Sequence, residues 1–202
     1  IRHNGAAWLS SLENFQGSMG RQITVRVGFA DRPHVVHTYG ATAADVHYTF
    51  YTGSQWISEG VPYGANLQAH PDRTPGFELG AQSTAHIAFI ARNKTSKTYA
   101  AYYARRTLPN TWIVEEAIPA AVLGASNYGD AHIALDAHGE PVIFTSNGVG
   151  ARRSPAGTWK TFQSGKPVDS LAVEGDYAYI TYPVDGASYY LQRLHLTLVD
   201  IR

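Results

Sequence analysis

Two segments of the chain gather polar and ionisable side chains of the kind that bind a polyol. Residues 63–78 read "YGANLQAHPDRTPGFE" and residues 120–130 read "AAVLGASNYGD". Carboxylates and amides hydrogen-bond the hydroxyl groups of a sugar, and an aromatic face can stack on its C–H side. Binding residues in repeat proteins gather where loops are elaborated on one face. The predicted ligand-binding residues are His70, Asp72, Arg73, Glu78, Asn127, Tyr128, Asp130 and His132.

The same residue types also suit acid–base catalysis. In that alternative, Tyr128 or His132 would act as the base, and Asp130 or Glu78 as the acid or charge neutraliser. The reaction would be that of a polysaccharide lyase or a glycoside hydrolase. We favour a binding module without catalysis and keep the enzyme as the alternative.

The nine histidines do not form a recognisable metal site. His34 and His37 stand three residues apart in one expected strand, so their side chains point to opposite faces. No His, Asp and Glu spacing matches a zinc or calcium motif. We therefore expect neither a metal ion nor another cofactor.

The elements that must position these residues follow from a repeat marked by tryptophan. Trp8, Trp56, Trp112 and Trp159 each close a short turn-like stretch, and they recur at intervals of roughly 50 residues. Between them lie short segments rich in β-branched and aromatic residues, bounded by Gly, Pro or Asp, as in "PHVVHTYG" and "AHIAFIARN". This pattern predicts an all-β chain, a small β-propeller in which each tryptophan is a wedge between neighbouring blades.

We expect one domain over residues 1–202, with four blades. The chain ends where the last unit needs its fourth strand, while "AAWLSSLENF" near the start resembles an unpaired fourth strand. Strand exchange between the two ends would close the ring and cover the sheet edges. The alternatives are a fragment of a larger propeller and an assembly of two chains. The expected blades are residues 17–62, 76–118 and 129–165, and residues 168–202 completed by 1–16.

Composition excludes several classes of partner. Sixteen basic and sixteen acidic residues cancel, so no net charge attracts the chain to nucleic acid or to an anionic membrane. No apolar run is long enough to insert into a bilayer. Cysteine is absent, which removes disulfides and thiolate chemistry. The chain opens "IRHNG", without Met or a signal peptide, which we interpret as a mature or trimmed form.

The stretch "SPAGTW" at residues 154–159 resembles the Asp box of the sialidase-like BNR-repeat propellers. The Asp of that motif is replaced by Ala156 or displaced, and the other three stretches match only the turn and the Trp. The resemblance implies a secreted or extracytoplasmic protein that handles glycans, since the group includes sialidases, polysaccharide lyases and lectins. A sialidase site is disfavoured, because Arg105, Arg106, Arg152 and Arg153 fall on third strands, away from a central channel.

Three functions therefore remain after the sequence analysis. The first is a lectin-like glycan-binding module with a carbohydrate ligand. The second is a polysaccharide lyase or glycosidase that uses the same face, and the third is a protein-binding scaffold. The sequence predicts no particular oligomeric state.

Overall fold

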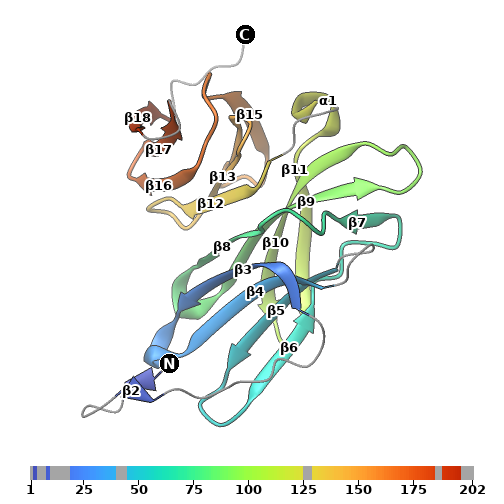
Figure 1. Cartoon of the computed structure of the whole chain (residues 1–202), viewed down its shortest axis with the longest axis vertical. Helices are drawn as coiled ribbons and strands as arrows, with labels where there is room; N and C mark the ends of the chain where they lie inside the picture. Colours follow the sequence, from blue (N-terminus) through green and yellow to red (C-terminus); the bar gives the residue numbers. More distant parts are fainter. Residues whose placement is uncertain are drawn as a thin grey trace.

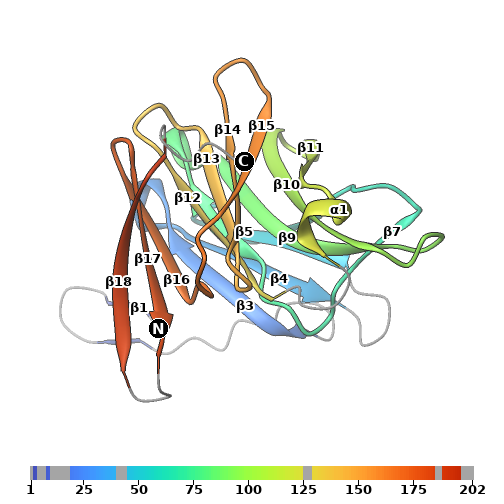
Figure 2. The same cartoon turned by 90° about the horizontal axis from the view of Figure 1, so that it is seen from above.

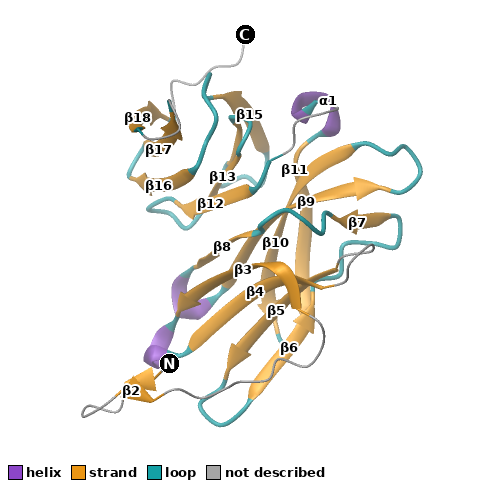
Figure 3. Cartoon of the chain, viewed as in Figure 1, coloured by secondary structure: helices purple, strands orange, loops and turns teal. Residues whose placement is uncertain are grey.

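The prediction of an all-β chain is confirmed. The computed structural model describes residues 2–3, 8–9, 19–39, 45–124, 129–184 and 188–196. Within these ranges antiparallel strands form four successive sheets, and the helical elements are the single turn α1 (Ala120–Leu123) and two short 3-10 turns (Figures 1 and 3). No helix in these ranges is long and apolar enough to cross a lipid bilayer.

Sheet 1 is a four-stranded antiparallel meander in chain order. Its strands are β3 (Met19–Val27), β4 (Pro33–Tyr39), β5 (Asp45–Tyr51) and β6 (Trp56–Gly60). Val, Ile, Thr and aromatic residues dominate these strands, as expected for a pleated, half-buried surface. The β5–β6 turn contains Gly53 at φ 104°, a conformation that glycine adopts without steric cost.

Sheet 2 differs from the predicted unit at its first strand. Its strands are β7 (Leu67–Ala69), β8 (Gly76–Leu79), β9 (Ala85–Asn93), β10 (Tyr99–Leu108) and β11 (Thr111–Ile118). Both β7 and β8 pair with β9, so they form one interrupted edge strand. Part of the segment 63–78, which we expected to be a loop, is therefore strand.

Sheets 3 and 4 continue the same meander. Sheet 3 contains β12 (Ala131–Leu135), β13 (Pro141–Thr145), β14 (Val149–Arg153) and β15 (Trp159–Gln163). Sheet 4 contains β16 (Ser170–Glu174), β17 (Tyr177–Pro183) and β18 (Tyr189–His195). Each strand pairs with the next one along the chain.

The four sheets follow one another as blade-like layers (Figures 1 and 2). Contacts between β3 and β8, between β8 and β12, and between β12 and β16 place the first strands of the four sheets along the inside of the series. One buried apolar cluster fills each space between neighbouring sheets. The first strands are therefore the elements that surround a common centre.

The described residues do not show a closed ring. β1 (Arg2–His3) pairs with β2 (Trp8–Leu9) in a separate two-stranded sheet. The predicted completion of the fourth sheet by residues 1–16 is not seen at these four residues, and β18 has β17 as its strand partner in the described part of the chain. Trp8–Leu9 pairs with Arg2–His3, which are close to it in the sequence. This pairing closes a much shorter loop than pairing with β18 at the other end of the chain would close.

Two of the tryptophans are wedges between sheets, as the repeat predicts. Trp112 in sheet 2 meets Tyr48 of sheet 1 edge-on, with ring centroids 5.6 Å apart. Trp159 in sheet 3 meets Tyr103 of sheet 2 in the same way at 5.5 Å. Such aromatic pairs contribute about 0.5–1.5 kcal/mol beyond the area they bury. The side chain of Trp8 lies outside the described residues.

Ion pairs accompany both wedges and involve the second arginine of each doublet, Arg106 and Arg153. Arg106 donates Nε to Glu59 Oε2 of the preceding sheet at 2.9 Å, and its Nη2 contacts the other carboxylate oxygen. Arg153 makes two 2.9 Å hydrogen bonds to Glu115 in the same arrangement one sheet later. Bidentate guanidinium–carboxylate pairs fix orientation as well as adding energy. These arginines therefore hold sheets together, away from the centre.

Candidate functional site

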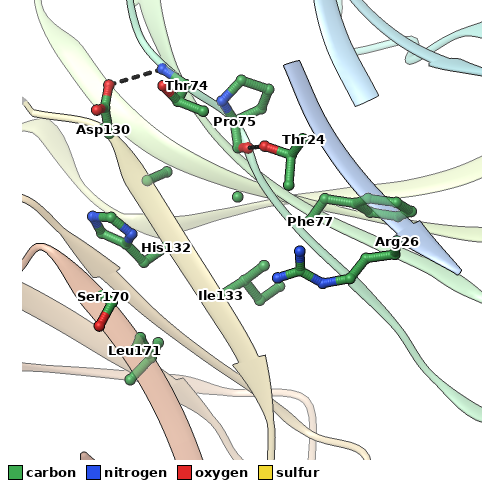
Figure 4. A pocket seen from close by; sticks show the side chains of 12 residues that line it. Thr24, Arg26, Thr74, Pro75, Phe77, Asp130, His132, Ile133, Ser170 and Leu171 are labelled. Atoms are coloured by element: carbon green, nitrogen blue, oxygen red, sulfur yellow. Dashed lines mark hydrogen bonds between the residues drawn. The ribbon is translucent and has the colours of Figure 1, made fainter. Parts of the chain in front are cut away.

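The first strands of all four sheets line one central pocket of about 280 Å³. Figure 4 shows its lining side chains, which come from β3, from β8 and the segment before it, from the start of β12, and from β16. The polar groups at the pocket are the hydroxyls of Thr24, Thr74 and Ser170, the Arg26 guanidinium, the Asp130 carboxylate and the His132 imidazole.

An insertion in the first strand of sheet 2 shapes one wall of the pocket. Residues 70–75, "HPDRTP", lie between β7 and β8 and form an insertion in this edge strand. His70 N–H still donates to Ile90 O of β9 at 3.0 Å, and the chain leaves β9 after His70. Pro71 and Pro75 lack the backbone N–H that a ladder requires, which explains why strand pairing stops here. The segment returns to β9 at Gly76, opposite Ala88. Thr74 and Pro75, at its end, line the pocket.

Hydrogen bonds tie this insertion to both neighbouring sheets. The Thr74 backbone N–H donates to Asp130 Oδ1 at 2.8 Å, which joins sheet 2 to sheet 3. Thr24 Oγ1 donates to the Pro75 carbonyl at 2.8 Å (Figure 4). Thr74 Oγ1 donates to Gln22 Oε1, also at 2.8 Å, and both bonds join sheet 2 to sheet 1. Four groups that line the pocket are thus held by contacts between sheets. These hydrogen bonds fix the geometry of this wall.

Gly76 brings the inner strands of sheets 2 and 3 close together at the pocket. A Cβ at this position would lie 2.7 Å from the Ala131 carbonyl oxygen and 3.0 Å from the Ile133 backbone nitrogen. These neighbours are main-chain atoms of β12 and cannot rotate away. Any side chain here would therefore separate β8 from β12, the strands that begin just after Thr74 and Asp130.

Of the predicted site residues, Asp130 and His132 line the pocket. Glu78 stands beside it and pairs with Arg26 Nε at 3.3 Å. This ion pair is partly exposed to solvent, so it contributes modest energy. It leaves the guanidinium Nη2 of Arg26 as a donor at the pocket.

Three of the other predicted residues do not line the pocket. His70, Asp72 and Arg73 belong to the insertion 70–75, and none of the three lines the cavity. The His70 ring packs near Tyr99 of β10, with centroids 5.6 Å apart. Asn127 and Tyr128 lie outside the described residues.

The His132 imidazole hydrogen-bonds other groups of the protein. Its Nε2 lies 3.2 Å from Ser146 Oγ, and the imidazole also hydrogen-bonds the Val168 backbone. Burial lowers the pKa of His132, with smaller opposing effects from Asp130 and Asp169. His132 and Ile133 point to opposite sides of β12 (Figure 4). The imidazole is therefore neutral near pH 7 and helps to join sheets 3 and 4.

The sequence analysis missed Thr24, Arg26, Thr74 and Ser170. Thr24 and Arg26 alternate with Ile23, Val25 and Val27 along β3, and this period of two places the polar pair on one face. The alternation is visible in the sequence. Whether this polar pair lines a site depends on which face of β3 turns toward the centre of the four sheets.

Among the described ranges, no three His, Asp or Glu side chains group as ligands for a metal ion. His37 and His47 stack at 5.6 Å in sheet 1, and burial is the main cause that lowers the pKa of each.

No protein-family model and no curated protein matches the chain.

Proposed function

We propose that the chain is a lectin-like module that binds one unit of a carbohydrate in the central pocket. The observation that carries this proposal is the convergence of three hydroxyls, one guanidinium and one carboxylate from the first strands of four sheets. A hydroxyl both donates and accepts hydrogen bonds, which matches the hydroxyls of a sugar. The cavity of about 280 Å³ is close to the lower limit of roughly 300–1,000 Å³ for ligand pockets and suits a single ring.

The hydrogen bonds already made inside the pocket leave complementary groups for a ligand. Thr24 and Thr74 each donate their hydroxyl proton to the protein, so their oxygens remain acceptors. Asp130 uses Oδ1 for Thr74 and, among the described residues, Oδ2 accepts no hydrogen bond. Arg26 supplies donors, and the half-buried Leu171 supplies an apolar wall for the C–H face of a ring.

The likeness to Asp-box repeats supports a carbohydrate ligand and a secreted or extracytoplasmic location, and we propose both. In the structure, residues 154–159 form the turn of the β14–β15 hairpin, with Ser154 N–H donating to Thr158 O at 2.8 Å and Gly157 at φ 84°. The turn and the following Trp159 are the parts of the motif that this chain keeps.

A binding module is favoured over a lyase or glycosidase by the state of His132. A general base must reach a substrate proton, whereas this imidazole is turned to Ser146 and Val168. Tyr128, the other proposed base, lies outside the described residues. The scaffold alternative would use the same face without requiring a polar pocket.

A glycan array followed by calorimetry on the best ligand tests the proposal. Asp130→Asn keeps an oxygen acceptor for the Thr74 N–H but removes the charge. We expect about ten- to hundredfold weaker binding, the equivalent of one hydrogen bond to a charged group. Asp72→Asn is the matched control, because Asp72 is an exposed carboxylate two residues from Thr74 that does not line the pocket.

The same ligands should be tested for new reducing or unsaturated ends. Release of such ends would favour the enzyme over the lectin. Equal loss of affinity in Asp130→Asn and Asp72→Asn would place the ligand outside the central pocket.

A further inference from the structure

One wall of the central pocket presents hydrogen-bond acceptors rather than donors. Thr74 Oγ1 donates its proton to Gln22 Oε1 at 2.8 Å. Thr24 Oγ1 donates its proton to the Pro75 carbonyl, also at 2.8 Å. A hydroxyl whose proton is already used offers a ligand only its lone pairs. Figure 4 shows Thr74, Pro75 and Thr24 along one side of the pocket, with Asp130 at the end of this row.

Asp130 adds a charged acceptor to the same wall. Its Oδ1 accepts the Thr74 N–H at 2.8 Å, while Oδ2 accepts no hydrogen bond in the part of the chain that the structure describes. The side chain is partly buried, and none of the ion pairs among the described residues includes it. A ligand that covers this carboxylate removes further water from it. Such a ligand must therefore supply a hydrogen bond and compensate the charge.

The other charged groups around the pocket do not neutralise Asp130. Arg26 pairs with Glu78 Oε2 at 3.3 Å, and this pair as a whole carries no charge. Burial lowers the pKa of His132, which is therefore neutral near pH 7, and Asp130 and Asp169 both oppose this shift. The two carboxylates thus act on the same imidazole. Asp169, directly before β16, adds a second negative charge near the pocket.

The charged residues of the insertion between β7 and β8 leave this balance unchanged. Asp72 and Arg73 are adjacent and opposite in charge. Burial lowers the pKa of His70, and Arg73 and Asp72 shift it in opposite directions. Neither of the two lines the cavity. The described groups around the pocket therefore carry an excess of negative charge.

We propose that the central pocket selects a sugar that carries a free ammonium group, such as an unsubstituted hexosamine. This inference rests on the proposed carbohydrate-binding function and names the class of ligand. An ammonium group has three N–H donors, no acceptor and a positive charge. It matches Asp130 Oδ2 together with the acceptor oxygens of Thr24 and Thr74. A sugar hydroxyl supplies one donor and no charge, and an acidic sugar would meet Asp130 with a charge of the same sign.

Oligosaccharides that differ only at C2 of each unit test this selectivity. Oligomers of glucosamine, N-acetylglucosamine and glucose, with the same linkage and length, are compared by calorimetry, and an oligomer of glucuronate supplies the acidic comparison. We expect the glucosamine oligomer to bind about tenfold more tightly than the glucose and N-acetylglucosamine oligomers, because a charge-assisted hydrogen bond is roughly twice as strong as a neutral one. The glucuronate oligomer should bind most weakly. Added salt should weaken the glucosamine complex and leave the glucose complex unchanged.

Two substitutions test whether Asp130 causes the preference. Asp130→Asn keeps an oxygen acceptor for the Thr74 N–H and removes the charge, so the ratio of the glucosamine and glucose affinities should fall to about one. Asp72→Asn is the matched control, because it removes an exposed carboxylate that does not line the pocket. It should keep the wild-type ratio. Urea denaturation shows whether both variants are folded.

The outcomes separate this inference from the proposed function. A chain that binds the glucose or glucuronate oligomer as tightly as the glucosamine oligomer would overturn the ammonium selectivity and leave the glycan-binding proposal standing. An Asp130→Asn variant that keeps the preference would do the same, as would an Asp72→Asn variant that loses it equally. A chain that binds none of these oligomers and nothing on the glycan array would overturn the proposed function, and this inference with it.

Discussion

Trp159 Nε1 donates a 2.8 Å hydrogen bond to Glu115 Oε2 of the preceding sheet, and the same carboxylate receives two hydrogen bonds from Arg153. The hydrogen bonds from Arg153 are the main cause that lowers the pKa of Glu115, and the one from Trp159 adds to it. The equivalent Trp112 packs on Tyr48, but its Nε1 has no hydrogen-bond partner among the described residues. The two wedges therefore differ in one polar contact.

This difference predicts unequal costs for the same substitution. Trp159→Phe removes a hydrogen bond to a charged acceptor, while Trp112→Phe removes a buried N–H that lacks a partner. We expect Trp159→Phe to lower the free energy of unfolding by about 1.5 kcal/mol more than Trp112→Phe, the low end for hydrogen bonds to charged groups because this one is partly solvated. Urea denaturation of the two variants measures the difference. Equal losses of unfolding free energy in the two variants would mean that the hydrogen bonds from Arg153 alone are enough to stabilise the Glu115 carboxylate.

Gly76→Ala should destabilise the protein through the contact between β8 and β12. The new Cβ would overlap main-chain atoms of Ala131 and Ile133, and forced overpacking costs about 1–3 kcal/mol. Gly60→Ala is the control, because the nearest atom to its Cβ would be His47 Cε1 at 3.9 Å. The control should match the wild type or exceed its thermal stability slightly. Similar melting temperatures for both variants would contradict the close approach of the two strands.

The stability of the protein should fall with acidification because of His86. Its Nδ1 lies 2.7 Å from Tyr103 Oη, and burial, aided by Arg105, lowers the pKa of His86 to about 4. An unfolded chain has a histidine pKa of about 6.5, so below that pH the unfolded state binds the proton more readily. The contribution of His86 is complete above about pH 6.5 and is lost as the pH falls toward 4, by up to about 3 kcal/mol.

An NMR titration of His86 together with urea denaturation across this pH range checks the prediction. His86→Phe should flatten the dependence of stability on pH, although it lowers stability at pH 7 by leaving the Tyr103 hydroxyl without its partner. A native His86 that titrates near its ordinary pKa would contradict the burial of the imidazole between sheets 2 and 3.

Asp130 should protect the Thr74 amide from exchange with solvent. Asp130→Ala removes the acceptor of the Thr74 N–H, and we expect exchange at this amide to accelerate by about ten- to hundredfold, as for loss of a hydrogen bond to a charged group. Asp130→Asn should keep most of the protection, since its side-chain oxygen still accepts. Hydrogen–deuterium exchange resolved at residues 70–75 measures both. Unchanged exchange in Asp130→Ala would mean that the insertion is held by Gln22 and Thr24.

Part of the candidate site could be predicted from the sequence. Asp130 ends the second elaborated segment and His132 follows it, and their position before and within an expected strand places them near the centre. His70, Asp72 and Arg73 were assigned to the same site because residues 63–78 were interpreted as a loop. The segment instead contains β7 and re-pairs at Gly76, so these three residues stand in an insertion of the edge strand.

The remaining site residues depend on long-range packing. Thr24 and Ser170 are separated by most of the chain, and they share a pocket only because β3 and β16 are both first strands of their sheets. The interpretation of His132 depends on long-range packing as well. Its partners Ser146 and Val168 come from other parts of the chain, and sequence spacing does not show that they will occupy its ring nitrogens.

The sequence by itself determined the all-β class, the succession of strand-rich units and the place of Trp112 and Trp159 as wedges. These features follow from local periodicity and from a repeat, and both act over short distances along the chain. Only the tertiary structure decided which face of each first strand turns inward, where the edge strand of sheet 2 is interrupted, and that residues 2–3 pair with residues 8–9. Those outcomes depend on contacts between sheets, where packing and hydrogen-bond satisfaction outweigh local preference.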